Sequence, residues 1–213
     1  MRLLTGTLVA DGSSDRLLKP ILDWLLKQWL PTGTALDLQV PDWGRFPRPV
    51  PTLATKVLAA RQFFQADVYF LHRDAEKESW ATRYTEITTA AHRILGPAAP
   101  FVRVIPVRMT EAWLLHNEPA IREAAGNPNG RMPLPLPTAA KLDALPKPKE
   151  ELLRLLREAS GLSGRHLQKF RERERRRLHR LADIQQETGF GVLRGLPAFD
   201  ALEAEVKEYV AGL

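Results

Sequence analysis

The sequence predicts an α/β protein with a mostly parallel sheet flanked by helices, followed by an all-helical extension. Two observations support this prediction. Within the first 125 residues, short apolar segments alternate with segments whose apolar residues recur at helical spacing. Beyond a proline-rich stretch, only the helical spacing remains. Because strands that are separated by helix-sized crossovers pair in parallel, the alternation indicates a sheet with helices on both faces.

Four strands and four helices are expected in the first part of the chain. The strands are expected at residues 3–10, 35–40, 68–71 and 101–107. The helices are expected at residues 17–26, 52–65, 78–95 and 110–125, and Pro119 must kink or split the last of them. Four prolines between Pro41 and Pro51 predict a loop.

The second part of the chain differs in composition. Residues 126–149 contain six prolines and no periodicity, which predicts a long connector. Helices are then expected at residues 150–160, 165–187 and 198–210. We therefore expect an α/β domain over residues 1–125, a connector over 126–149, and a helical extension over 150–213 that packs on the domain.

The composition excludes several classes of protein. The 213 residues include no cysteine, which rules out disulfides, thiolate nucleophiles and cysteine-ligated metals and predicts a cytoplasmic location. No apolar run approaches 18 residues, so we expect no membrane association, and the N-terminal segment predicts a strand, not a signal peptide. No phosphate-binding glycine motif is present, so the chain itself is not expected to hydrolyse ATP.

Positive charge is concentrated in one segment. The formal net charge of the chain is +6, and residues 165–180 alone carry eight Lys or Arg against two Glu. Five of these cations recur along one side of the expected helix: Arg165, Lys169, Arg173, Arg176 and Arg180. Such a stripe predicts contacts with the nucleic-acid backbone, with little sequence preference. The alternative is a solvated helix face.

Acidic residues follow three of the expected strands. Asp11 and Asp15 follow the first, Asp74 and Glu76 the third, and Glu111 the fourth. Each alone could be a helix cap or a first-turn acidic residue. Together they would lie within roughly 5–10 Å of each other, because parallel strands end at the same sheet edge about 4.8 Å apart. Converging carboxylates repel unless a cation neutralises them, so a Mg²⁺ or Mn²⁺ site is expected.

Two further residues stand beside the third strand. Arg73 adds a positive charge that would either bind phosphate or neutralise an acidic site without a metal. His72 would serve in proton transfer, bind phosphate or have a structural role. The spacing of the five histidines does not suggest a zinc site.

These motifs resemble those of the DUF4276 family, a Toprim-like group related to the Toprim domains of topoisomerases, primases and OLD-family nucleases. The resemblance depends on residues 9–15 (VADGSSD), 74–76 (DAE) and 109–115 (MTEAWLL). Weaker similarity extends to residues 146–149 (PKPK) with Leu152, and to residues 193–199 (LRGLPAF). In two places this chain departs from the family pattern: Asp11 replaces a Glu, and Glu76 replaces an Asp.

The resemblance implies a Toprim-like, Rossmann-like fold and Mg²⁺-dependent nuclease chemistry. It also implies association with an ATPase subunit encoded nearby, in bacterial antiviral or anti-plasmid defence. Asp11, Asp74 and Glu76 would hold the metal, with Asp15 and Glu111 in support. In a nuclease of this kind we expect Arg73, or an Arg of residues 165–180, to contact phosphate. Two other hypotheses remain open: a non-catalytic module that binds nucleic acid or an ATPase, and a phosphotransferase that uses the same site.

Overall fold

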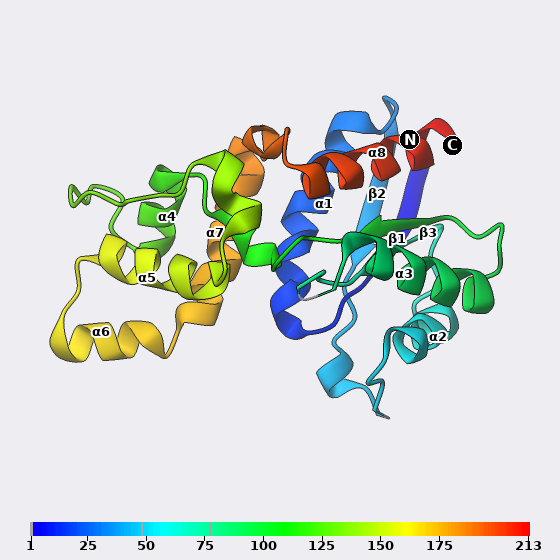
Figure 1. Ribbon diagram of the computed structural model, residues 1–213, viewed down its shortest axis with the longest axis horizontal. Coiled ribbons are helices and arrows are strands. Elements are labelled where there is room, and N and C mark those ends of the chain that lie inside the picture. Colours follow the sequence, from blue (N-terminus) through cyan, green and yellow to red (C-terminus); the bar gives the residue numbers. More distant parts are fainter. Residues whose placement is uncertain (1, 48, 77) are drawn as a thin grey trace. The chain divides into compact units, whose positions relative to one another are not determined.

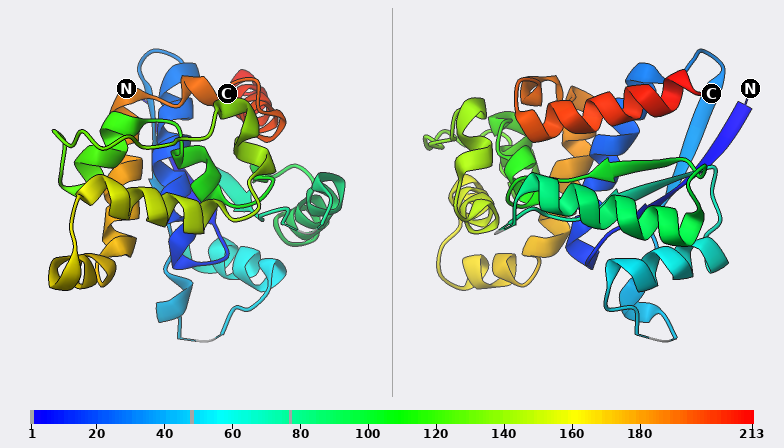
Figure 2. Two further views of the ribbon diagram at one scale, coloured as in Figure 1. Left: turned by 60° about the vertical axis from the view of Figure 1, so that its left-hand side comes forward. Right: turned by 45° about the vertical axis from the view of Figure 1, so that its right-hand side comes forward.

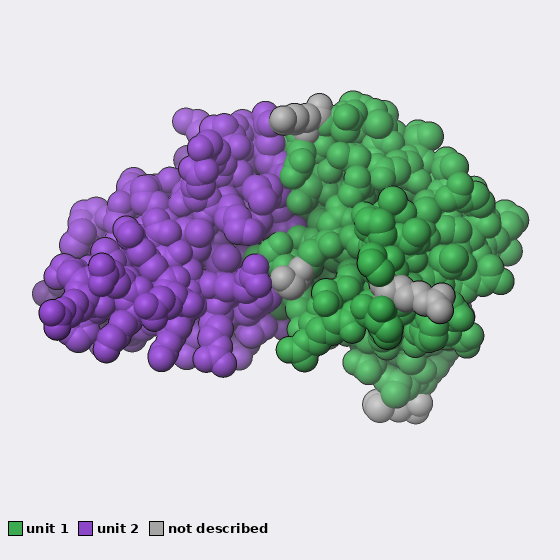
Figure 3. All heavy atoms as spheres, turned by 90° about the horizontal axis from the view of Figure 1, so that it is seen from below, with its two compact units in different colours: residues 1–107, 197–213 green, residues 108–196 purple. Residues whose placement is uncertain are grey.

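The computed structural model describes residues 2–47, 49–76 and 78–213, apart from the side chain of Ser13. The chain forms two compact units, shown in different colours in Figure 3. Unit 1 comprises Met1–Val107 and Pro197–Leu213, and unit 2 comprises Arg108–Leu196. Each unit is described by itself.

Unit 1 is built on a four-stranded parallel sheet. Its strands are β1 (Arg2–Val9), β2 (Thr34–Gln39), β3 (Val68–His72) and β4 (Phe101–Val104), in the order β2-β1-β3-β4. Val9 at the end of β1 pairs with Leu71 near the end of β3. The α/β fold with a parallel sheet that the sequence predicted is therefore confirmed.

Helices cover both faces of this sheet (Figures 1 and 2). α1 (Leu18–Trp29) and α8 (Pro197–Ala211) pack against each other on one face. α2 (Leu53–Phe63) and α3 (Trp80–Leu95) pack together on the other. The strand order explains this arrangement. The crossover through α1 runs in the opposite direction along the sheet from the crossovers through α2 and α3, and right-handed crossovers then lie on opposite faces.

The strand order reverses between β1 and β3. The chain leaves β1 toward β2 on one side and leaves β3 toward β4 on the other. The carboxyl ends of β1 and β3 are thus neighbours at a topological switch point, which is where parallel α/β sheets bind their ligands. The turns that follow these two strands carry Asp11 and Asp74.

Unit 2 is helical. It contains α4 (Glu118–Ala125), α5 (Pro148–Ser160), α6 (Gly164–Arg171) and α7 (Glu174–Thr188), together with the 3₁₀ turns η3 (Thr110–Leu114), η4 (Ala139–Ala144) and η5 (Gly191–Leu193). α4 packs against α5 and α7 around a core that includes Trp113, Leu155 and Phe190. Across the described part of both units, no helix combines the length and apolar character needed to cross a membrane.

The helix expected at residues 110–125 is two elements, η3 and α4. Pro119 lies in the first turn of α4, where its missing N–H costs nothing. The side chain of Asn117 caps this helix by accepting a hydrogen bond from the backbone N–H of Ala120 at 3.1 Å. The chain thus starts a new helix at the point where proline would have broken a continuous one.

The division into units differs from the expected boundaries after residues 125 and 149. Residues 126–149 belong to unit 2, where Leu134 and Leu142 are buried in its interior. The end of the chain returns to the sheet of unit 1, because α8 packs on β4 and Glu205 pairs with Arg103 at 2.6 Å. These are contacts between residues far apart in the sequence, which local composition does not reveal.

The prediction of one helix over residues 165–187 is wrong. α6 ends at Arg171 and α7 begins at Glu174, and Arg173 between them has the non-helical angles φ −117° and ψ 11°. Glu174 at the start of α7 pairs with Arg157 of α5 at 2.5 Å, and Phe170 near the end of α6 is buried. These two anchors fix separate helices. The expected cations therefore lie on two helices and the junction between them, and not along one.

Candidate functional site

Asp11 is held by two cations of unit 1. It follows the end of β1, and its Oδ1 lies 3.0 Å from Nζ of Lys56 on α2. Its Oδ2 accepts a hydrogen bond from Arg73, which follows β3. The ammonium group of Lys56 also donates to the backbone carbonyl of Asp11 at 2.8 Å. Because the Lys56 side chain is only 6% exposed, this charge is removed from water and directed at Asp11.

A second network centres on His72, the last residue of β3, whose side chain is fully buried. Its Nε2 lies 3.2 Å from Oδ1 of Asp74, and its Nδ1 lies 3.6 Å from Oδ2 of Asp15. That same oxygen of Asp15 accepts a hydrogen bond from the backbone N–H of Gly12 at 2.7 Å. The imidazole thus joins a carboxylate from the turn after β1 to one from the turn after β3.

The electrostatics of the two networks agree with their geometry. Burial alone would raise the pKa of Asp11, but Lys56 and Arg73 outweigh burial, so that the pKa of this carboxyl is lowered. Burial likewise disfavours the charged form of His72, but Asp74, then Asp15 and Asp11, raise the pKa of the imidazole overall. The site therefore favours ionised Asp11 and protonated His72.

The turn after β3 is held by the chain that follows β4. The backbone N–H groups of Ala75 and Glu76 donate to the carbonyls of Pro106 at 2.8 Å and Val107 at 2.9 Å. Glu76 has φ +51°, a left-handed conformation that costs a non-glycine residue of order 1–3 kcal/mol. Its side chain is exposed. Backbone strain of this kind is concentrated at functional sites, so Glu76 remains a candidate.

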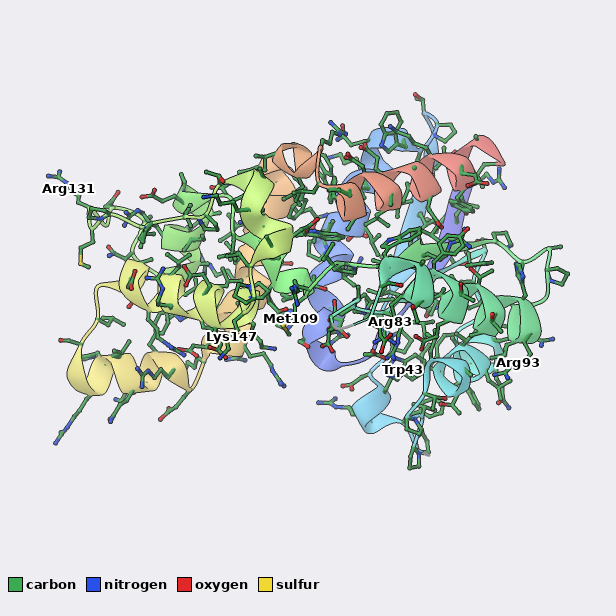
Figure 4. The ribbon with its side chains drawn as sticks, viewed as in Figure 1. Trp43, Arg83, Arg93, Met109, Arg131 and Lys147 are labelled. Atoms are coloured by element: carbon green, nitrogen blue, oxygen red, sulfur yellow. The ribbon has the colours of Figure 1, made fainter. Side chains whose placement is uncertain are left out.

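Arg83 and Glu86 of α3 form an outer layer behind these residues (Arg83 is labelled in Figure 4). Glu86 forms an ion pair with Arg73, whose Nε lies 3.1 Å from its Oε1, and accepts a hydrogen bond from Nη1 of Arg83 at 2.7 Å. Arg83 also donates from Nε to the backbone carbonyl of Asp74 at 3.1 Å. The guanidinium of Arg73 is therefore held between two carboxylates, Asp11 and Glu86, and is well oriented.

The acidic side chains at the ends of β1 and β3 are of the chemical type that binds a hard divalent cation, because they are carboxylates. Their arrangement is less suitable for a cation, because Asp11 is already paired with Lys56 and Arg73. Within the described residues, no group of three or more His, Cys, Asp or Glu side chains has a metal-binding arrangement. Asp74 uses one oxygen toward His72 and Glu76 is exposed, so these two are the carboxylates most open to a cation.

Glu111 belongs to unit 2, unlike the other four acidic candidates. It lies in η3, is 3% exposed, and pairs with Nζ of Lys149 at 3.1 Å. The structure thus brings Asp11, Asp15 and Asp74 into one connected cluster at the switch point, with Glu76 at the same strand end. Glu111 instead forms an ion pair within the helical unit, with the half-exposed side chain of Lys149.

The five residues of unit 2 that were expected to contact nucleic acid all have exposed side chains. Arg165 and Lys169 lie on α6, Arg173 at the junction, and Arg176 and Arg180 on α7. Arg180 is 3.5 Å from Glu123, an ion pair between half-exposed side chains. Arg171 and Arg175 are exposed as well. A cationic surface over α6 and α7 therefore replaces the expected single stripe.

Three residues of the site were not singled out from the sequence: Lys56, Arg83 and Glu86. Lys56 lies on the buried face of α2, between Leu53 and Val57 on one side and Ala60 on the other. A lysine at a core position of an amphipathic helix is the signal that could have identified it, because buried lysines need a partner. Glu86 of α3 gave no such signal, since its position follows from a contact with Arg73.

Comparisons with known proteins add no assignment. The chain matches no family model, no curated protein and no solved structure. The resemblance to the Toprim-like group therefore depends on the sequence motifs alone.

Proposed function

We propose that the protein is a metal-dependent nuclease that hydrolyses phosphodiester bonds of DNA or RNA at the carboxyl ends of β1 and β3. One observation carries the proposal: Asp11, Asp15 and Asp74 converge at the switch point together with Arg73, Lys56 and a buried His72. Carboxylates and cations side by side at a ligand-binding edge suit a phosphoryl group, which needs both metal ligands and positive contacts.

Each side chain then has a role that its contacts support. Asp74 and Glu76, with Asp11, would hold Mg²⁺ or Mn²⁺, which when bound would orient the phosphate and lower the pKa of water. His72 fixes the carboxylates of Asp74 and Asp15 from within the core. Arg73 is already oriented by Glu86 and would turn its guanidinium from Asp11 to a phosphate oxygen.

The cationic surface of unit 2 supports nucleic acid as the substrate. Its exposed arginines and lysine give the chain an excess of positive charge in one region, and backbone phosphates are the matching partner. The Toprim-like resemblance extends the proposal to a role in bacterial defence with an ATPase subunit encoded nearby.

A second function, binding without cleavage, is supported by a different observation. The pairing of Asp11 with both Lys56 and Arg73 neutralises this carboxylate without a metal. The same fold would then bind nucleic acid or a partner ATPase without cleaving it. Arg73 and Lys56 would be structural cations in that case, and the cationic surface of α6 and α7 would be the functional part.

A cleavage assay tests the proposal and separates these functions. Plasmid, linear duplex, single-stranded DNA and total tRNA are incubated with Mg²⁺, Mn²⁺ or EDTA. The wild-type protein is expected to cut at least one substrate with a cation and none with EDTA. Asp74→Asn is expected to reduce the rate at least 100-fold, whereas Asp37→Asn, an exposed acid of β2, leaves it unchanged.

The other outcomes assign the alternatives. Binding of these substrates without cutting, by wild type and Asp74→Asn alike, contradicts the nuclease and supports the binding module. Turnover of nucleotides with no cutting of polynucleotides supports a phosphotransferase. Cutting that survives Asp74→Asn places the reaction elsewhere in the molecule.

A further inference from the structure

A cavity of about 260 Å³ lies beside Asp11, within unit 1. Its walls come from two of the sheet's strand ends: Asp11 and Gly12 after β1, and residues 41–44 after β2. Arg16, on the 3₁₀ turn η1 (Ser13–Leu17), completes the lining. Ligand pockets of drug size commonly occupy roughly 300–1,000 Å³, so this cavity suits a smaller group, of the size of one flat ring system.

The aromatic wall of the cavity is Trp43, which begins the 3₁₀ turn η2 (Trp43–Arg45) and is labelled in Figure 4. Edge-on contacts hold its ring, with ring centroids 5.8 Å from Phe46 and 5.9 Å from Phe64. Its indole Nε1 is buried and has no hydrogen-bond partner among the residues described. A flat ring held by its neighbours in this way is a feature that a ligand with a flat face would complete.

The polar groups around Trp43 suit the rest of a nucleotide. Arg16 is exposed and donates only to the carbonyl of Val40, at 3.3 Å, and within the described residues it has no carboxylate partner. Its guanidinium is therefore available to a phosphate. Asp42 is exposed: its Oδ1 accepts a hydrogen bond from the backbone N–H of Gly44 at 3.1 Å, and its Oδ2 lies 3.4 Å from Nε of Arg45. Both contacts are at the surface, and each oxygen keeps a lone pair to which an amino group can donate.

We propose that this cavity takes one unpaired base of the nucleic-acid strand, which lies against Trp43 while its neighbouring phosphate reaches Arg73, the ion-pair partner of Asp11. This inference depends on the proposed action on nucleic acid, and it restricts the range of expected substrates. Asp11 belongs to both the cavity and the switch-point cluster, so a base held here brings its own backbone to the carboxylates. Bases inside a duplex are stacked and paired, whereas those of a single strand are free to enter. The substrate class is therefore single-stranded or locally unpaired nucleic acid.

The test compares probes that differ in whether their bases are present and in whether those bases are paired. Fluorescence anisotropy with EDTA, which prevents cutting, measures the affinity for a labelled single-stranded DNA 20-mer, an abasic strand of the same length and the matching duplex. Wild type is expected to bind the single strand about tenfold more tightly than the abasic strand. Trp43→Ala is expected to remove that difference, and Trp43→Phe to keep most of it. Arg16→Gln should weaken binding of both strands, because Arg16 contacts phosphate.

Trp80→Ala is the matched control. Trp80 is a 39% exposed tryptophan of the same unit that packs on Tyr84, and its loss should change neither affinity. Equal wild-type affinity for the normal and abasic strands overturns the inference while leaving action on nucleic acid intact. An equal loss for both strands in Trp43→Ala overturns it too. No binding of any probe by wild type overturns the proposed function together with the inference. If Trp43→Ala does not fold, the wild-type comparison and Trp43→Phe decide.

Discussion

At the scale of single residues, Asp11 shows the largest difference between prediction and structure. The sequence predicted a metal ligand, and the structure pairs this carboxylate with two cations, Lys56 and Arg73. Its position at the same sheet edge as Asp74 follows from the parallel pairing of β1 with β3, which the sequence predicted. Its pairing with Lys56 did not follow, because that contact joins β1 to a helix 45 residues away. The sequence could predict that Asp11 and Asp74 follow strands that end at one sheet edge, but not that Glu111 would belong to the other unit, nor which cations would meet Asp11.

Glu76 gives a prediction that separates stability from function. Because its φ of +51° suits glycine, Glu76→Gly should raise the free energy of unfolding by about 0.5–1 kcal/mol. The same change removes a proposed cation ligand, so cation-dependent cleavage should fall. Urea unfolding and the cleavage assay measure the two effects.

Glu78→Gly is the control for that experiment. Glu78 is exposed two residues further along, and glycine there should lower the free energy of unfolding, because the unfolded chain gains freedom with no strain relieved. A loss of stability in Glu76→Gly equal to that in Glu78→Gly would contradict the strain at residue 76.

At the scale of elements, the break between α6 and α7 shows what charge patterning cannot predict. Residues 171–175 contain neither glycine nor proline, so nothing in the local sequence ends a helix there. The break arises from contacts made elsewhere, chiefly that of Glu174 with Arg157 on α5. By contrast, the strands of unit 1 were predicted to within a few residues, because buried apolar segments bounded by turns are a local signal.

The cations of α6 and α7 give a prediction about salt. If they contact phosphates, replacing Arg165, Lys169 and Arg176 with Gln should make the slope of log affinity against log salt less steep by about 2 on single-stranded DNA. The reason is that binding releases fewer counterions from the nucleic acid when fewer phosphates are contacted. Anisotropy titrations at several salt concentrations measure the slope.

A charge-matched variant controls for net charge. It replaces three exposed cations outside these helices with Gln: Lys27, Arg93 and Lys141. Its slope should stay near that of wild type. Equal slopes in both variants would show that the affinity depends on overall charge and not on α6 and α7.

At the scale of the whole molecule, two histidines in different units respond to pH in opposite directions: His72, which is fully buried, and His116, which is partly buried. The raised pKa of His72 means that its contribution to stability is fully present below the unfolded value of 6.5 and is lost as pH rises through the folded pKa. The pKa of His116 in unit 2 is lowered to about 4 by burial, so its contribution is present above pH 6.5 and is lost as pH falls toward 4.

The His116 shift predicts acid sensitivity of unit 2. Lowering the pH from 7 to 5 should remove about 2 kcal/mol through this residue, since the unfolded state takes up the proton first. His116→Gln should flatten that part of the profile. Unfolding free energies of wild type and variant between pH 7 and pH 5 test this, and parallel profiles would contradict it.

The two-unit organisation was the part of the fold least accessible to sequence reasoning. The proline-rich segment 126–149 has the composition of a connector, yet it lies within unit 2. α8 returns to unit 1 through contacts such as that with α1, in which Nε1 of Trp29 donates to Glu203 at 2.9 Å, across 174 positions. Contacts of that range leave no local pattern, whereas the α/β alternation that revealed the sheet is local.

Binding of Mn²⁺, followed by the loss of its electron paramagnetic resonance signal, tests the central claim most directly, because it needs no substrate. We expect wild type to bind Mn²⁺, and Asp74→Asn to lose that binding while Asp37→Asn retains it. Mg²⁺ should compete for the same site. Wild-type protein that leaves the free Mn²⁺ signal unchanged would contradict a cation site at the ends of β1 and β3.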